Sequence, residues 1–304
     1  MKEQTKDTAP ERHTTKRRRG SKKKRARRGG AIRSVLMAVF FLGFCYSAFR
    51  LGKDIFSDFK AQRGFDELSA IVSESAAQNT ASAQNAADAS ASAAGKEPGA
   101  ESAEDKSDAE PVYAPLAEYA RLHEMNEEFF GWLKIEGLEI DYPVMYAPTR
   151  SEYYLNRDFY GEYSVSGIPF VDGRCPAEGN YYLIYGHLMK NKTIFGRLPQ
   201  YEDEQCWREN PVITFDTVYE HRQYAVMACF LSKIYAVDEV GFRYYTYFDL
   251  RDEDTFNEYV SQVMAASLYD TGVRASWGDE LLVLTTCSEH VSDGRFVLVA
   301  KRIA

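Results

Sequence analysis

The sequence predicts a mainly β domain, an antiparallel barrel or sandwich, that follows an N-terminal apolar segment. Beyond residue 112, short β-branched and aromatic runs alternate with turn residues, as is typical of antiparallel folds. Two stretches there have helical spacing, too few to cover both faces of a parallel sheet. The region of about 190 residues is long enough for a single core.

The 304-residue chain opens with a basic segment followed by an apolar one. Residues 1–33 hold fourteen of the 37 Lys and Arg but three of the 45 Asp and Glu. Residues 34–49 are uncharged and are bounded by Arg33 and Arg50. Such a helix rises roughly 24 Å, and snorkelling arginines extend its reach across a ~30 Å hydrocarbon core. We expect a basic cytoplasmic tail at 1–33 and a single-pass transmembrane anchor at 34–51.

Two alternatives compete with an uncleaved anchor. A signal peptide would end in a small-x-small site, and residues 46–48 (Tyr-Ser-Ala) match one poorly. Nucleic-acid binding would suit the basic block alone, but the adjoining apolar span argues against it, so no nucleic-acid partner is expected. The positive-inside rule then places the N-terminus in the cytoplasm and the rest of the chain outside the cell membrane.

Residues 52–111 are expected to combine a juxtamembrane helix with a low-complexity spacer. Residues 53–72 have loose amphipathic spacing. Residues 73–111 are dominated by Ala, Ser, Asp, Glu, Gln and Asn, which indicates a disordered or frayed segment. An alanine-rich helix is the alternative, although Ser, Asn, Asp and Gly weaken it. The globular domain is therefore residues 112–304.

Within this domain, periodicity and turn residues define the expected elements. Residues 116–130 and 255–268 place apolar side chains at helical spacing. Apolar runs bounded by turn residues indicate strands. The expected strands are 132–135, 139–145, 168–171, 181–185, 212–215, 223–235, 280–286 and 295–302.

The last two expected strands bring a thiol and a guanidinium to one end of a sheet. Cys287 ends the first strand, and Arg295 opens the second after the short loop 288–294. A permanent positive charge beside a cysteine favours the reactive thiolate. The simpler interpretation is a small buried cysteine and a solvated arginine.

A nucleophilic cysteine also needs a base, and the chain has five histidines. His187 closes the strand 181–185 after Gly186, at a strand end that matches that of Cys287. His290 lies three residues beyond Cys287 and stays open as a rival because its proximity is guaranteed. The others are simplest as non-catalytic residues: His13, His123 and His221.

No metal or cofactor is expected. The remaining cysteines beyond the anchor have no CxxC or Cys/His ligand spacing: Cys175, Cys206 and Cys229. If Cys287 stays free, these three cannot all pair, so a disulfide-stapled scaffold is not expected either.

The residues around these groups resemble those of the sortases, most closely class B, which are membrane-anchored cysteine transpeptidases of Gram-positive bacteria. The resemblance rests on Tyr185-Gly-His187, then Leu284-Thr-Thr-Cys287, then Arg295, in that order behind an N-terminal anchor. Further matching runs lie at 132–135, 140–144, 153–156, 158–159, 167–172 and 189–198. It implies a closed antiparallel β-barrel with an N-terminal helix and a long helix, here 255–268, before the cysteine strand.

Two positions depart from the family pattern. The usual TLxTC motif begins with Thr, where this chain has Val283; the change does not touch the reactive atoms. Pro169 stands where class B members usually continue a strand, which suggests an edge or a bulge beside the substrate groove.

The resemblance implies that Cys287 attacks the carbonyl of a Thr in the C-terminal sorting signal of a secreted surface protein. His187 would act as general acid and then base, and Arg295 would hydrogen-bond the oxyanion. A peptidoglycan precursor amine would resolve the thioester. By position, Tyr185, Asn156 and Thr285 are expected to line the groove, with the aromatic stretch 242–248 nearby.

Three alternatives remain. A pilin-polymerising sortase would usually carry a lid before the barrel and an apolar C-terminal tail. The sequence ends at Ala304 directly after the last expected strand, which disfavours this alternative. A papain-type hydrolase would place its cysteine before its histidine and at a helix start, the reverse of this order. A catalytically silent surface-binding module would share the fold without a reactive thiol.

Overall fold

The computed structural model describes residues 23–91 and 114–304, which form two units that divide between Ile55 and Phe56. The first unit lies within the long helix α1, Lys23–Ala91. One span of α1, Arg33–Arg50, is long and apolar enough to cross a membrane. The side chains of this span are exposed.

Helix α1 continues through residues 73–91, where the composition had suggested a disordered or frayed segment. Alanine is the strongest helix former, and a helix already nucleated by 53–72 extends at low cost. The rest of the expected spacer, and most of the basic tail, lie outside the described residues. The boundaries of tail, anchor, spacer and domain therefore stay predictions.

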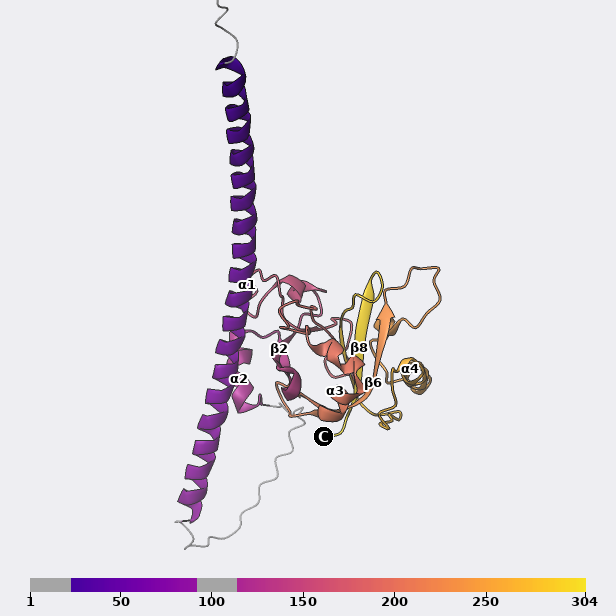
Figure 1. The fold of residues 1–304 in the computed structure, drawn as a ribbon. Helices are drawn as coiled ribbons and strands as arrows, with labels where there is room; N and C mark the ends of the chain where they lie inside the picture. Colours follow the sequence, from indigo (N-terminus) through magenta and orange to yellow (C-terminus); the bar gives the residue numbers. More distant parts are fainter. Residues whose placement is uncertain (1–22, 92–113) are drawn as a thin grey trace, which may run out of the picture. The chain divides into compact units, whose positions relative to one another are not determined.

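In the second unit the described strands close into an eight-stranded barrel with the order β1-β2-β3-β4-β7-β8-β6-β5 (Figure 1). The strands are β1 Phe129–Ile135, β2 Ile140–Tyr146, β3 Phe170–Val171, β4 Tyr181–Tyr185, β5 Val212–Thr217, β6 Gln223–Lys233, β7 Leu281–Cys287 and β8 Gly294–Arg302. The helices are α2 Ala117–Met125, α3 Glu204–Glu209 and α4 Glu253–Ala266, with 3-10 turns η1 Glu136–Leu138, η2 Tyr153–Asn156, η3 Leu198–Glu202 and η4 Tyr244–Thr246. The predicted mainly β closed barrel is confirmed.

Six of the eight pairings among the described strands are antiparallel, and two, β2–β3 and β4–β7, are parallel. The barrel thus departs from a wholly antiparallel arrangement at two seams. Parallel neighbours need a long crossover connection, and β5, β6 and α4 provide it between β4 and β7. As a result, β4 and β7 end at the same rim of the barrel.

Several element boundaries differ from the sequence expectation, and two of them have a clear local cause. Helix α2 ends at Met125 because the side chain of Asn126 accepts a hydrogen bond from the Glu128 backbone N–H, a local turn that competes with the helix. Strand β3 begins only after Pro169, whose carbonyl still accepts a hydrogen bond from the Met145 backbone.

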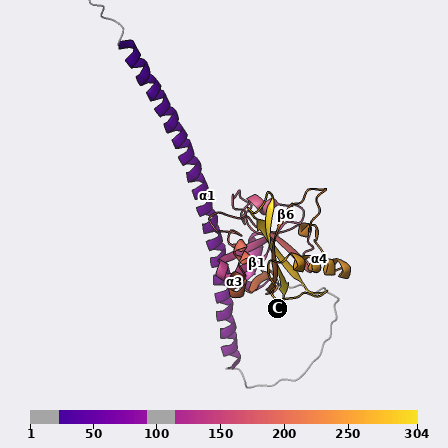
Figure 2. The ribbon, with the colours of Figure 1, turned by 45° about the vertical axis from the view of Figure 1, so that its right-hand side comes forward.

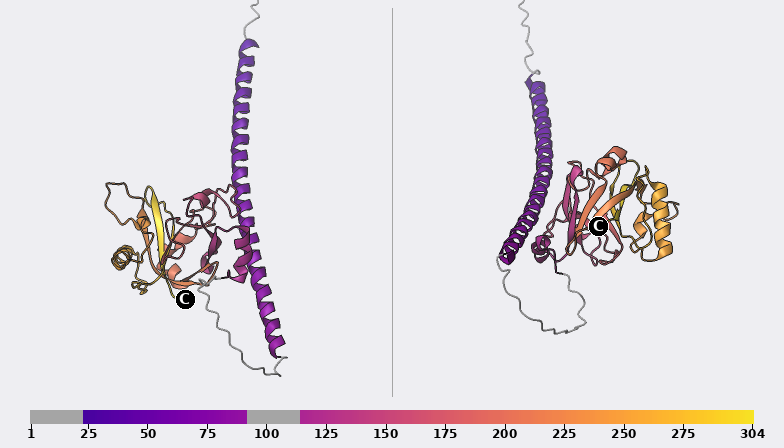
Figure 3. Two further views of the ribbon diagram at one scale, coloured as in Figure 1. Left: turned by 180° about the vertical axis from the view of Figure 1, so that it is seen from behind. Right: turned by 90° about the horizontal axis from the view of Figure 1, so that it is seen from below.

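Helix α4 flanks the barrel on the outside, next to β6 (Figures 1 and 2), and the two further views of Figure 3 agree on this position. It is the long helix that was expected before the cysteine strand. Phe256, Tyr259 and Val263 are its buried face. From α1, Phe65 is also buried and meets the Tyr142 ring edge-on at 4.9 Å.

His221 ties helix α2 to the barrel rather than standing free in its turn. Its ring nitrogens lie 2.9 Å from an Asp216 carboxylate oxygen and 3.1 Å from a Glu118 oxygen. The hydrogen bond to Asp216 raises the pKa of His221, although partial burial opposes the shift. Tyr119 also donates to Asp216 at 2.8 Å. This cluster has a structural role, away from the pocket described next.

Candidate active site

Cys287 and Arg295 face each other across the β7–β8 ladder. Cys287 is the last residue of β7 and pairs directly with Arg295 of β8. Opposed residues of an antiparallel pair lie close together on one face of the sheet, so the thiol and the guanidinium share one side of the rim. The Cys287 thiol is exposed.

Arg295 keeps its charge available. Its Nη1 donates to two backbone carbonyls, those of Gly294 at 2.9 Å and Asp293 at 3.3 Å. No carboxylate in the described part of the chain forms an ion pair with it. The backbone bonds orient the guanidinium without neutralising it, as an anion-binding arginine requires.

The parallel pairing of β4 with β7 brings His187 to the same rim. Tyr185 is in register with Thr285, and the Gly186 N–H donates to the Thr285 carbonyl at 3.2 Å. His187 and Cys287 therefore each stand two residues beyond a paired position. Gly186 is required there because a Cβ would lie 2.5 Å from the Phe195 ring.

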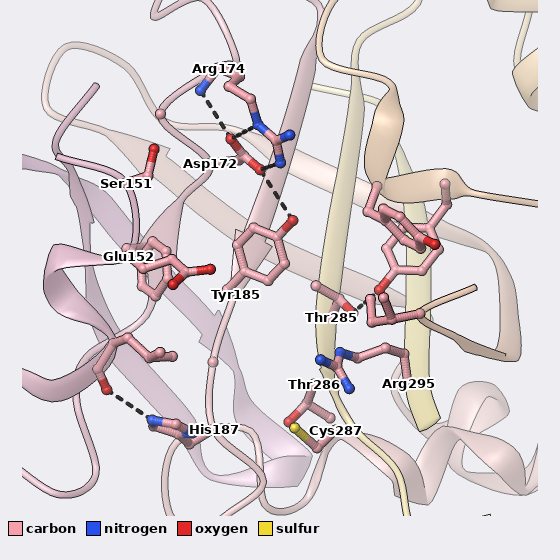
Figure 4. A pocket seen from close by; sticks show the side chains of 17 residues that line it. Ser151, Glu152, Asp172, Arg174, Tyr185, His187, Thr285, Thr286, Cys287 and Arg295 are labelled. Atoms are coloured by element: carbon pink, nitrogen blue, oxygen red, sulfur yellow. Dashed lines mark hydrogen bonds and ion pairs between the residues drawn. The ribbon is translucent and has the colours of Figure 1, made fainter. Parts of the chain in front are cut away.

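The imidazole of His187 is held by a backbone carbonyl. Its Nε2 lies 2.8 Å from the Leu155 oxygen, which can only accept, so Nε2 carries a proton. Figure 4 shows the His187 ring across the pocket from Cys287. No hydrogen bond joins the His187 ring to Cys287 among the described residues. Catalytic hydrogen bonds often tighten only when substrate is bound.

These three side chains line one cavity of about 670 Å³, a size typical of ligand pockets. Its walls come from η2, the β3–β4 turn, the ends of β4 and β7, and the segment that follows β6 (Figure 4). The lining residues are Ser151, Glu152, Leu155, Phe170, Asp172, Gly173, Arg174, Tyr185, Gly186, His187, Ile234, Tyr244, Tyr245, Thr285, Thr286, Cys287 and Arg295.

Two of the three residues expected along the groove lie in this cavity. Tyr185 and Thr285 line it, whereas Asn156 is exposed at the end of η2 and its neighbour Leu155 takes the place in the wall. From the aromatic stretch 242–248, Tyr244 and Tyr245 also line it. The rival histidine, His290, is exposed, bonds Ser288 at 2.9 Å, and is not part of the lining.

A hydrogen-bonded floor of the cavity was not anticipated from the sequence. The buried Tyr244 hydroxyl lies 2.7 Å from Thr285 Oγ1, which donates to the Phe296 carbonyl at 3.3 Å. Burial raises the pKa of Tyr244 to about 12, so it stays a neutral phenol. The Thr286 hydroxyl is buried without a partner in the described part of the chain. The available sequence signal for these two threonines was their position just before Cys287 in the same strand.

An ion pair at the far end of the cavity was also missed. Arg174 donates two hydrogen bonds to the Asp172 carboxylate, from Nε at 2.9 Å and from Nη2 at 2.6 Å. The Tyr185 hydroxyl donates to the same carboxylate at 3.1 Å. Burial alone would raise the pKa of Asp172, but the hydrogen bonds from Arg174 lower it below its usual value. The Asp-Gly-Arg turn after β3 was a sequence signal for it.

The four thiols beyond α1 differ sharply in environment, which predicts different rates of alkylation. Burial raises the pKa of Cys175 to about 12 and of Cys229 to about 11, and it also raises the pKa of Cys206. Because only the thiolate reacts, the exposed Cys287 should alkylate roughly 100-fold faster. Brief iodoacetamide treatment followed by peptide mass spectrometry measures this, and similar rates at all four sites would contradict it.

Fold and site together define a β-barrel cysteine enzyme, in which a thiol, an imidazole and a guanidinium share one pocket. No group of three or more His, Cys, Asp or Glu side chains able to hold a metal occurs in the described residues. A family model described as "Sortase domain" matches residues 133–303, more than half of the chain. The chain belongs to the sortase family.

Its relatives specify the class. Over 190 residues it is 26% identical to sortase B of Staphylococcus aureus, covering 61% of this chain and 75% of that protein. Over 186 residues it is 26% identical to sortase B of Listeria monocytogenes, covering 60% and 72%. A solved Staphylococcus aureus sortase B–substrate complex is similar with a TM-score of 0.54 at 25% identity, covering 61% and 84%. This chain is a class B sortase, a cysteine transpeptidase.

Proposed function

We propose that this class B sortase cleaves a C-terminal sorting signal after threonine and joins the new carboxyl end to a peptidoglycan precursor amine. The observation that carries the proposal is that Cys287, His187 and Arg295 line the same cavity at the ends of β4 and β7. A solved relative is a complex with a substrate, which supports a peptide as the ligand of this cavity.

In the first half-reaction, the Cys287 thiolate attacks the threonine carbonyl carbon. Arg295 lies beside the sulfur and stabilises the resulting oxyanion. The peptide C–N bond breaks, His187 gives its proton to the leaving amine, and a thioester to Cys287 remains. In the second half-reaction an amine attacks the thioester carbon, His187 takes a proton, and the thiolate leaves.

The N-terminal region fits a tethered enzyme. The span Arg33–Arg50 anchors the chain in the cell membrane, residues 1–33 stay in the cytoplasm, and residues 112–304 work on the extracellular side. The basic residues before the span set this orientation. Residues 52–111 connect the anchor to the catalytic domain.

A ligation assay tests the proposed function. The full chain in detergent is incubated with fluorescence-quenched sorting peptides and with triglycine, a pilin lysine peptide or no amine. Triglycine is chosen since a solved sortase B is complexed with that tripeptide. Cleavage after Thr and a triglycine-ligated product in the mass spectrum are expected, and peptides with Val in place of that Thr serve as controls. Binding without cleavage would overturn the proposal in favour of a silent binding module, and ligation only to a pilin lysine peptide in favour of pilin polymerisation.

A further inference from the structure

Two acidic and two basic side chains, Glu152, Asp172, Arg174 and Arg295, line the cavity. Asp172 and Arg174 neutralise each other through their ion pair at 2.6 Å. Arg295 stands beside Cys287 with its charge free for an oxyanion. The Glu152 side chain makes no hydrogen bond or ion pair with the described residues. One unpaired positive and one unpaired negative group therefore remain in the pocket.

The negative group is built into the same turn that holds the catalytic imidazole. Glu152 precedes η2 in the left-handed region, with φ 59°, and three residues later the Leu155 carbonyl binds His187 Nε2. Glu152 lines the pocket, and Figure 4 shows its carboxylate pointing toward the Tyr185 ring, on the same side of the pocket as His187. The turn thus presents a carboxylate and an oriented histidine on one wall, while Arg295 and Cys287 occupy the other.

We propose that Glu152 is the residue that attracts and orients the ammonium of the incoming amine substrate; this inference rests on the proposed function. A primary amine such as a lysine side chain arrives protonated at neutral pH, and a carboxylate at the pocket wall raises its local concentration. The two substrate groups carry opposite charges: the oxyanion is stabilised by a cation, and the ammonium is attracted by an anion before it loses its proton. Arg295 and Glu152 occupy these two places.

The proton balance makes His187, and not Glu152, the base that deprotonates the incoming amine. After the first half-reaction His187 is neutral. The ammonium loses two protons as its nitrogen forms the new amide bond and the C–S bond breaks. One proton restores the His187 imidazolium beside the Cys287 thiolate, and the other passes to solvent. Glu152 acts by placing the ammonium next to His187.

The test compares a charged and an uncharged nucleophile. For Glu152→Gln, the KM for triglycine should rise about five-fold at low ionic strength, the size expected for one charge pair at an exposed residue. The rise should shrink in about 0.5 M salt, because salt screens exposed charges. Hydroxylamine is uncharged at neutral pH, so its KM should change much less. Glu152→Lys should enlarge the triglycine effect. Glu178→Gln, an exposed glutamate outside the pocket, is the matched control and should match the wild type.

Two results would overturn the inference, and they are distinguishable. If Glu152→Gln raises the KM for triglycine and for hydroxylamine equally, Glu152 does not recognise the ammonium. The same holds if the substitution lowers kcat/KM for the peptide as much as for the amine. If the wild-type enzyme releases no peptide with either nucleophile, no acyl-enzyme forms, and the proposed function fails together with this assignment.

Discussion

Cys287→Ala is expected to abolish both peptide cleavage and acyl-enzyme formation. The thiolate makes the only covalent bond to substrate in the proposed mechanism, so no second group can replace it, and the rate should fall at least ~10⁴-fold. Because Cys287 is exposed at the end of β7, the substitution should shift the free energy of unfolding by less than about 0.5 kcal/mol. Release of the quenched peptide and the mass of the intact protein measure the loss of cleavage and of acyl-enzyme, and a denaturant titration measures the stability.

A matched control tests whether a histidine that is merely close to Cys287 in the sequence takes part in the reaction. His290 lies in the loop beside Cys287 but is exposed, bonded to Ser288, and outside the cavity lining. His290→Ala should therefore keep turnover within about two-fold, as is usual for surface substitutions. Cleavage by the Cys287→Ala protein above the uncatalysed rate, with a normal melting curve, would remove the sulfur from the mechanism.

Arg295→Ala is expected to lower kcat/KM by about 10²–10³-fold, the usual loss for one oxyanion donor. Arg295 donates only to the Asp293 and Gly294 carbonyls in the described chain, so its removal breaks no ion pair of the fold. Arg295→Lys keeps the charge but not the planar fork, so its activity should lie between alanine and wild type. Initial rates over a range of peptide concentrations give kcat and KM separately.

An exposed arginine elsewhere provides the comparison for this second prediction. Arg251 pairs with Asp249 on the surface, with 65% of its side chain exposed, and lies outside the cavity lining. Arg251→Ala should be neutral. Turnover of the Arg295→Ala enzyme within a few-fold of wild type would show that another donor holds the oxyanion, and the backbone N–H groups of the 288–294 loop would be the next to examine.

The local sequence pattern predicted the strands whose bounds are set by apolar runs and turn residues. The strand 181–185 has the observed bounds of β4, and the last two strands are within one residue of β7 and β8. Other boundaries differ by up to five residues, and in two cases a side chain overrides the periodicity: Asn126 ends α2 early, and Pro169 delays β3. In both cases a hydrogen-bonding group of the backbone was diverted or missing.

The local sequence likewise predicted some residues of the site and missed others. Cys287 and Arg295 lie on two strands joined by a short loop, so a hairpin sufficed to bring them together. Asn156 misses the cavity lining by one position, because a 3-10 turn sends consecutive side chains in different directions. Glu152, Tyr244 and the Asp172–Arg174 pair come from three separate segments and had no shared sequence signal.

The local sequence was sufficient to predict the apolar span, the strands, and a thiol beside a guanidinium. Each of these features depends on residues only a few positions apart. The parallel seam between β4 and β7 depends on closing the barrel over about a hundred residues, and no local pattern encodes that choice. Only the tertiary structure could therefore set His187 on the rim of Cys287, bind its ring to Leu155, and bring the Glu152 carboxylate into the same pocket.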